Sequence, residues 1–186
     1  MAVAMLAAGC GNREKDATEA AISAAQSAIN AVREQAEKYV PEQLQAAEKT
    51  LQSARDALAK GDYEKALAGT RDAAKRAKEM AEAAVGKKEE WARTWKELNE
   101  SLSKTMAQVN GKLDAYSRGA RMPEGMDKGA LEEAKKQYAE LKQKWAEAVS
   151  SANTGDLREA IRKGTDVKEL LEKLKEMLGI KTENKK

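Results

Sequence analysis

The residue with the most distinctive chemistry in this sequence is Cys10, which stands where an apolar N-terminal run gives way to polar residues. Residues 1–9 are small or apolar, and charges begin at Arg13. The sequence contains one cysteine and no histidine. A single thiol can form neither a disulfide within the chain nor a thiolate cluster for zinc. The lack of histidine removes the commonest general base and the commonest transition-metal ligand.

The residues around Cys10 resemble the end of a bacterial lipoprotein signal peptide. In that family Leu, a small residue and Gly or Ala precede an invariant cysteine, which is acylated and becomes the N-terminus after cleavage. Ala8-Gly9-Cys10 match the last three places, and Leu6 lies one place early. The resemblance implies that residues 1–9 end a signal peptide that begins upstream of Met1, and that Cys10 is lipidated. The alternative is a small buried cysteine at the end of a short apolar helix.

Lipidation would make the membrane the first partner of this chain. Each buried methylene contributes about 0.8 kcal/mol, so two or three acyl chains hold a protein at a membrane durably. In Gram-negative lipoproteins an Asp after the cysteine alters sorting, so Gly11 implies by resemblance an outer-membrane protein that faces the periplasm. No later segment has the apolar length that a membrane crossing needs.

The other candidates for chemistry are carboxylates, whose positions favour solvation. A catalytic pair needs a dry pocket that pushes its two pKa values apart. The acidic residues here fall mostly on outward faces of the expected helices, for example Glu89, Glu90, Glu97, Glu132 and Glu133. The sequence contains no nucleophile elbow, phosphate-binding loop or metal-ligand set. We therefore predict no catalytic residue, no metal site and no cofactor.

Two apolar groups are candidates for contact with a ligand or a partner. Residues 117–126 form the one expected loop, and its possible partner contacts are Met122, Pro123 and Met126. The alternative is a connector that folds onto the end of the helices. A second group could line a pocket between helices, although its heptad spacing favours a core. Its members are Trp91, Trp95, Met106 and Trp145.

Composition and charge favour long helices and exclude a nucleic-acid partner. Aromatic residues make up only 4% of the chain, and alanine supplies much of its apolar content. The 34 basic residues are interspersed with 31 acidic ones, so the net charge of +3 marks no basic patch. The only prolines, Pro41 and Pro123, are the main helix breakers.

Heptad-spaced apolar residues predict an all-α fold. The expected helical segments are 16–39, 42–60, 63–84, 87–116, 127–152 and 156–178. A lone Gly costs a helix about 1 kcal/mol relative to Ala, so we expect the third and fourth segments to be nearly continuous through Gly86. The turn at Gly61-Asp62 returns at Gly155-Asp156, which indicates a duplicated hairpin.

The sequence thus predicts an elongated antiparallel helical bundle of two linked, coiled-coil-like three-helix units. They cover 10–85 and 86–180, and a disordered tail covers 181–186. The first segment is expected to carry an apolar seam, which consists of Ile22, Ala25, Ile29, Val32, Ala36 and Tyr39. A stripe of alanines is expected to widen this seam: Ala17, Ala20, Ala21, Ala24, Ala28 and Ala31. In the second segment Leu58 is expected to point inward. The second unit is expected to be better filled, with all three tryptophans in its core.

A second resemblance covers about Cys10 to Ala84. Pro-Glu-x-Leu-x-x-Ala at 41–47 and Gly-Asp-Tyr-x-x-Ala at 61–66 resemble a family of Ala-rich helical bacterial envelope lipoproteins that carry a domain of unknown function. The resemblance implies location and fold but no activity. GDYEKAL is also similar to part of a tetratricopeptide repeat, but that family repeats every 34 residues. The two Gly-Asp turns lie much farther apart.

These observations predict a membrane-anchored lipoprotein of the cell envelope that acts as a non-enzymatic structural or scaffolding bundle. The alternatives are a periplasmic chaperone or adaptor and a small-ligand carrier that uses the helical seams. A cell-wall partner is a further alternative, since some small helical lipoproteins are joined to the wall through a terminal Lys, here Lys186. Those proteins show Tyr-Arg before that Lys, where this chain has Asn184-Lys185. The heptads fit contacts within one chain or between chains, so they leave the oligomeric state open.

Overall fold

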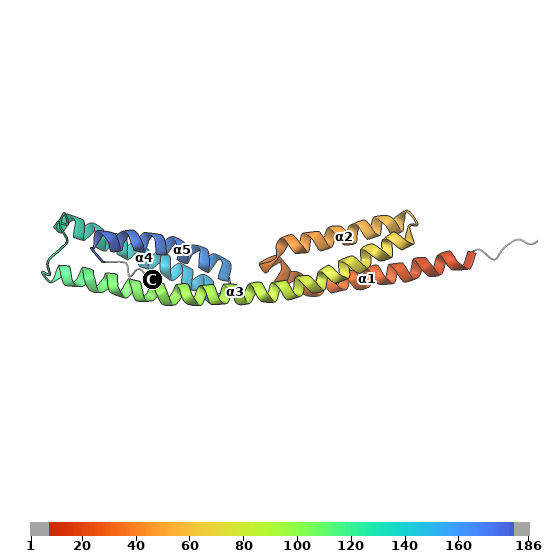
Figure 1. The fold of residues 1–186 in the computed structure, drawn as a ribbon, viewed down its shortest axis with the longest axis horizontal. Coiled ribbons are helices and arrows are strands. Elements are labelled where there is room, and N and C mark those ends of the chain that lie inside the picture. The colour runs from red at the N-terminus through yellow and green to blue at the C-terminus, as the bar shows by residue number, and fades with distance from the viewer. Residues whose placement is uncertain (1–7, 181–186) are drawn as a thin grey trace, which may run out of the picture. The chain divides into compact units, whose positions relative to one another are not determined.

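The protein is all-α in its computed structural model, which describes the backbone of residues 8–180 and the side chains of residues 13–180. This part of the chain contains five helices and no strand (Figure 1). They are α1 (Ala8–Tyr39), α2 (Pro41–Ala59), α3 (Tyr63–Ser117), α4 (Lys128–Asn153) and α5 (Leu157–Met177). The predicted all-α fold class is therefore confirmed. Residues 1–7 of the expected signal peptide and the expected tail at 181–186 lie outside the described residues.

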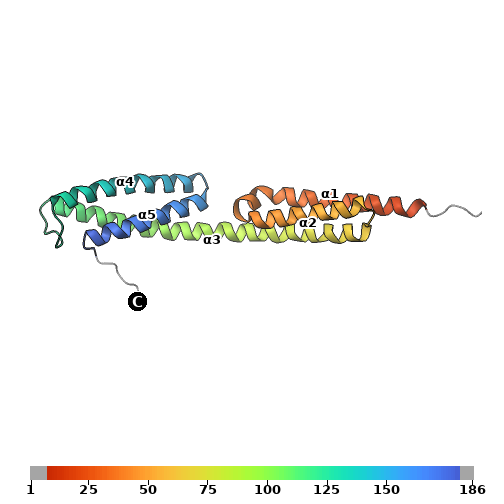
Figure 2. The same ribbon diagram turned by 90° about the horizontal axis from the view of Figure 1, so that it is seen from above.

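The chain divides into two compact units, and the boundary between them in the sequence falls between Glu89 and Glu90. The sequence placed this boundary a few residues earlier, between 85 and 86. Unit 1 contains α1, α2 and the first part of α3, and unit 2 contains the rest of α3 with α4 and α5. Within unit 1, α1 packs on α2, and within unit 2, α4 packs on α5 (Figure 2).

The helix α3 runs without a break for 55 residues and contributes to both units. Its continuity through Gly86 confirms the expectation from sequence. The physical reason is that one glycine weakens a helix only modestly, while no proline lies between Pro41 and Pro123 to remove a backbone donor.

The first helix begins at Ala8, well before the expected start near Asp16. No proline lies between these positions, and glycine alone does not end a helix.

The buried seam of α1 extends one step further toward the N-terminus than Ile22, because Thr18 follows the same spacing and is fully buried. Thr18 satisfies its hydroxyl within the helix, where Oγ1 donates to the carbonyl oxygen of Glu14 at 2.7 Å.

The expected second stripe on α1 does not form part of the core. Its members are exposed or half-buried, while Ile22, Ala25, Ile29 and Ala36 are buried as expected and Val32 is half-buried. The exposed members are Ala17, Ala20, Ala24 and Ala31, and the half-buried ones are Ala21 and Ala28. The prediction was wrong because a helix in a small unit buries one narrow seam, and small residues elsewhere on it gain no partner.

Unit 1 is thin because small residues let its helices approach closely. A Cβ added to Gly69 of α3 would lie 3.1 Å from the Cβ of Ala54 on α2. Near the end of α2, Ala57 is buried and the expected Leu58 is only half-buried. The larger side chain stays at the rim, since the narrow space between the helices fits alanine.

Unit 2 has a larger apolar core, shared by three helical segments. Its buried residues include Leu102, Met106, Val109, Leu113, Leu131, Leu141, Val167, Leu171, Leu174 and Leu178. Two buried tyrosines join its helices through their hydroxyls. Tyr138 Oη donates to the carbonyl oxygen of Met106 at 2.9 Å, and Tyr116 Oη donates to that of Leu178 at 2.8 Å.

The duplicated Gly-Asp turns have matching geometry in the two units. Gly61 and Gly155 adopt φ values of 74° and 80°, in the left-handed region that favours glycine. The following aspartates cap the next helix, because Asp62 accepts from the amide of Lys65 and Asp156 from that of Glu159, both at 3.1 Å. The hairpin α2 to α3 therefore corresponds to the hairpin α4 to α5.

Candidate functional site

Cys10, the predicted lipidation site, lies in the first turns of α1. Its side chain lies outside the described residues, as do those of its neighbours up to Asn12. The lipidation of Cys10 therefore stays a prediction from the sequence.

The connector between α3 and α4 folds onto one end of unit 2. Met122 and Met126 are half-buried against the core of this unit. Pro123 is also half-buried, and its Cγ would lie 3.1 Å from a Cβ on Gly179, just past the end of α5. Part of each side chain stays accessible, so a partner contact at these three residues stays a prediction.

The three tryptophans lie at the other end of the core of unit 2, and all of them are half-buried. Trp95 of α3 stacks on Trp145 of α4, with ring centroids 5.4 Å apart and an angle of 28° between the planes. The expected packing of tryptophans against one another is found for Trp95 and Trp145, but all three lie at the edge of the core and not within it. A ring of this size at the end of a three-helix unit is covered by its neighbours on one side only, whereas the leucines farther along α3 are enclosed.

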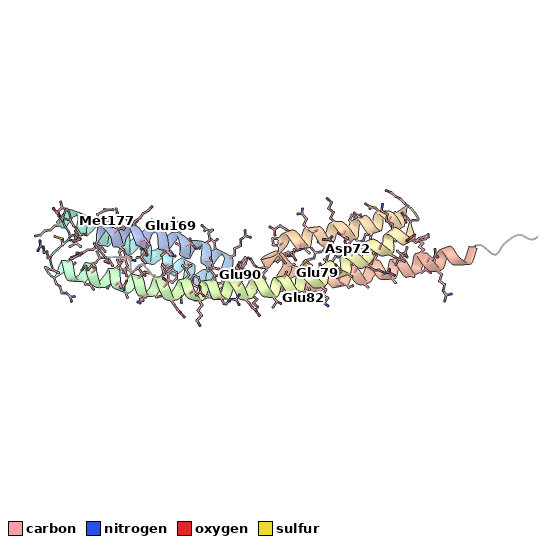
Figure 3. All side chains as sticks on the ribbon, viewed as in Figure 1. Asp72, Glu79, Glu82, Glu90, Glu169 and Met177 are labelled. Carbon is pink, nitrogen blue, oxygen red and sulfur yellow. The ribbon has the colours of Figure 1, made fainter. Side chains whose placement is uncertain are left out.

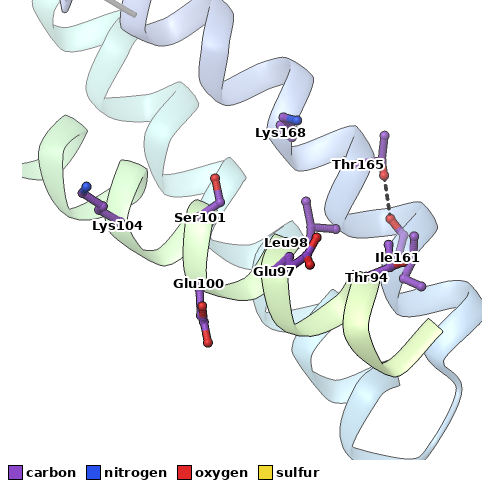
Figure 4. Close-up of a pocket in the computed structure, with 9 residues that line it drawn as sticks. All are labelled: Thr94, Glu97, Leu98, Glu100, Ser101, Lys104, Ile161, Thr165 and Lys168. Atoms are coloured by element: carbon purple, nitrogen blue, oxygen red, sulfur yellow. Dashed lines mark hydrogen bonds between the residues drawn. The ribbon is translucent and has the colours of Figure 1, made fainter. Parts of the chain in front are cut away.

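The structure shows a groove between α3 and α5 that sequence reasoning missed. Its volume is about 960 Å³ (Figure 4). The lining residues are Thr94, Glu97, Leu98, Glu100, Ser101, Lys104, Ile161, Thr165 and Lys168. Leu98 and Ile161 form its half-buried apolar floor, and the others are exposed. The sequence indicates this groove only weakly, because the one sign of it is a few short polar residues next to the apolar seams.

The contact between α3 and α5 beneath this groove depends on Gly164. A Cβ at that position would lie 2.7 Å from Cδ2 of Leu98 and 3.4 Å from the ring of Trp95. Glycine thus lets α5 lie against these two side chains. Leu98 fills the space that a larger residue at position 164 would need.

The charged side chains at the groove do not join the two helices beside it, whereas polar and charged side chains on the surface of α1 and α2 do. In unit 1, Arg33 pairs with Glu48 across the helices at 2.6 Å, and Arg55 donates to Gln26 at 2.8 Å. Among the described residues, the groove charges form no such pair across α3 and α5. The rim of the groove thus carries two carboxylates and two ammonium groups, from Glu97, Glu100, Lys104 and Lys168.

An exposed ion-pair cluster on α5 is a helix-stabilising feature. Arg162 donates to Glu159 at 2.6 Å and to Asp166 at 3.2 Å. The hydrogen bond from Arg162 holds the pKa of the Glu159 carboxyl below its usual range. These spacings are those of local pairs within one helix. No group of three or more Cys, Asp or Glu among the described residues is placed to hold a metal ion.

Within residues 8–180, no helix combines the length and the apolar character that a membrane crossing requires. Comparison with known proteins adds no identification, because no family model, curated protein or solved structure matches this chain.

Proposed function

We propose that this chain is a membrane-anchored bacterial lipoprotein of the cell envelope, attached through Cys10, whose helical units act as a non-enzymatic scaffold. The anchor rests on the resemblance of Ala8-Gly9-Cys10 to a lipoprotein signal sequence. By the same resemblance, Gly11 after the cysteine favours the outer membrane, with the helices in the periplasm.

The observation that carries the structural role is the continuity of α3. One hydrogen-bonded helix supplies seam residues to both cores, so no loop separates the two units. Each unit also buries its own apolar side chains. Among large apolar residues of the described chain, only Val85, Leu170 and Met177 are exposed. Such an architecture suits a protein that spaces or connects other components.

The first test is the intact mass and membrane fractionation of the protein expressed from its own gene. We expect the wild-type chain to begin with an acylated cysteine and to sediment with membranes, and the Cys10→Ser variant to be neither modified nor membrane-bound. Gly11→Asp is the matched control, since it keeps the cysteine and is expected to change only which membrane holds the protein. An unmodified wild-type chain that stays in the soluble fraction contradicts the proposal.

The scaffold part needs a separate test, in cells that lack the gene. A scaffold depends on its fold and its anchor, so single replacements of exposed carboxylates outside the groove, such as Glu132→Gln and Glu133→Gln, should restore the wild-type phenotype fully. Cys10→Ser should not. Loss of function on one carboxylate replacement, in a protein that still folds, would point to catalysis.

A second candidate, a carrier of a small ligand or peptide, is favoured by the groove between α3 and α5. A ligand in this groove would lie on Leu98, which is close to the ring of Trp95. Ligand binding should then change the tryptophan fluorescence, and Thr165→Phe should abolish the change by filling the groove without adding another tryptophan. An envelope extract that leaves the fluorescence of the wild-type protein unaltered removes this candidate.

A further inference from the structure

Residues 85–90 of α3, the junction segment, include no buried residue: Lys87 is half-buried and the other five are exposed. Ala84 is the last buried residue of unit 1, with 3% of its surface exposed, whereas the next residue, Val85, is 59% exposed. The next buried residue along α3 is Leu102. Trp91, the first half-buried aromatic residue of unit 2, follows the segment directly. Glu82 precedes the segment on α3, and Glu90 is its last residue (Figure 3).

The seam of α3 explains why packing stops at this point. In unit 1 the buried positions alternate by three and four residues, and the last three are Ala77, Met80 and Ala84. The same spacing next falls on residues 87 and 88, which are both lysine. Val85 and Gly86 lie beside that seam and are exposed. The apolar stripe that holds α3 to its neighbours is therefore interrupted for about two turns.

Gly86 weakens the helix at the same place. A Cβ at this position would meet no atom within 4 Å, so close packing does not require glycine there. Glycine costs a helix about 1 kcal/mol relative to alanine. Most of the stability of a helix in a protein comes from the packing of its apolar face. The junction segment contains no buried apolar residue. Its two lysines and two glutamates favour helix, so the intrinsically weak positions are Val85 and above all Gly86.

We propose that α3 opens locally at residues 85–90, more readily than either unit unfolds, so that this segment is a conformational joint in an otherwise continuous helix. Segments with few buried contacts and solvent-exposed backbone hydrogen bonds open at a lower free energy than the core. The boundary between the two units falls within this segment, at Glu89 and Glu90. The joint goes beyond the scaffold role and does not depend on the anchor at Cys10.

Amide hydrogen exchange of the full chain, followed by mass spectrometry or NMR, tests the joint. We expect the amides of residues 85–90 to exchange at least about tenfold faster than those of residues 106–113 of the same helix. Gly86→Ala should slow exchange in the junction segment about fivefold, which corresponds to the ~1 kcal/mol difference in helix propensity.

The matched control is Gly111→Ala. Gly111 is also an exposed glycine within α3, and a Cβ there would also meet no atom within 4 Å, but it lies between the buried Val109 and Leu113. It should stabilise unit 2 and leave exchange at 85–90 unchanged. Three results would overturn the proposal: equal exchange at 85–90 and 106–113 in the wild type, equal slowing of the junction segment by both substitutions, or fast exchange that Gly86→Ala does not slow.

Discussion

The hydroxyl of Tyr116, at the end of α3, donates a hydrogen bond of 2.8 Å to the carbonyl oxygen of Leu178, directly after α5. Both residues are buried, and 62 positions separate them in the chain. The bond satisfies a carbonyl at a helix end that has no partner further along its own helix. It therefore fixes the C-terminal end of α5 against α3, at the end of unit 2 that the connector covers.

Tyr116→Phe should destabilise unit 2 by about 1–3 kcal/mol, because it leaves the buried carbonyl oxygen of Leu178 without this donor. Chemical denaturation of wild type and variant measures the difference. Tyr63→Phe is the control, since the Tyr63 hydroxyl makes no hydrogen bond within the described chain and the residue is only half-buried. Equal effects of the two substitutions would contradict a specific role for the bond.

Gly69→Ala should destabilise unit 1, with a cost of about 1–3 kcal/mol from overpacking. The new Cβ would meet the Cβ of Ala54 at 3.1 Å and its Cα at 3.5 Å, and neither atom can move without α2. Gly111→Ala, in open space on the same helix, should instead stabilise by about 1 kcal/mol. Thermal denaturation of both variants separates the predictions, and a stabilised Gly69→Ala protein would show that α2 and α3 are less tightly packed than the structure indicates.

Asp156→Ala should cost unit 2 about 1 kcal/mol, because the amide of Glu159 loses its capping acceptor at the start of α5. Asp62→Ala should cost unit 1 a similar amount at the start of α3, since the two caps have the same 3.1 Å geometry. Unfolding followed by probes specific to each unit, such as tryptophan fluorescence for unit 2, measures the two costs. If Asp62→Ala changed the tryptophan transition as much as Asp156→Ala does, the two caps would not act on separate units.

Unit 2 should lose stability above about pH 10 in a manner that depends on Tyr138. Burial raises the pKa of the Tyr138 hydroxyl above its usual 10.0, and the nearby Asp114 carboxylate adds to the effect. Because the folded pKa is the higher one, the stabilising contribution is complete below the unfolded pKa and is lost as the pH rises through the folded pKa.

Denaturation curves of wild type and Tyr138→Phe at neutral and alkaline pH test this linkage. The wild type should be the more stable protein at pH 7, by about 1 kcal/mol from the hydrogen bond to Met106. The advantage should shrink above pH 10. A difference that stays constant from neutral to alkaline pH would show that Tyr138 ionises equally in the folded and unfolded chains.

Local signals in the sequence were sufficient for most of the fold. Gly61-Asp62 and Gly155-Asp156 are turn and cap residues whose conformation is set by their own backbone preferences, so the hairpins they join were predictable. Heptad spacing likewise identified most buried positions, from Ile22 in α1 to Leu178 beyond α5. These features depend on neighbours within one or two helical turns, which the sequence displays directly.

The candidate site was much less predictable. The tryptophans were expected in the core, and their half-buried positions depend on where the core of unit 2 ends. The groove depends on Gly164, which brings α5 against Leu98, and on the short side chains of Ser101 and Thr165 beside that contact. Spacing along one helix does not reveal which residue of another helix lies opposite.

The sequence by itself determined the helical fold, the two Gly-Asp turns, the main seams and the resemblance around Cys10. Only the tertiary structure decided that Thr18 is buried and Ala20 exposed, and that Ala57 replaces Leu58 in the seam. It also decided that a groove lies over the contact between α3 and α5. The physical reason is the distance along the chain over which each feature is determined. Helix formation and capping depend on residues a few positions apart, whereas burial and grooves depend on the close packing of side chains from different helices.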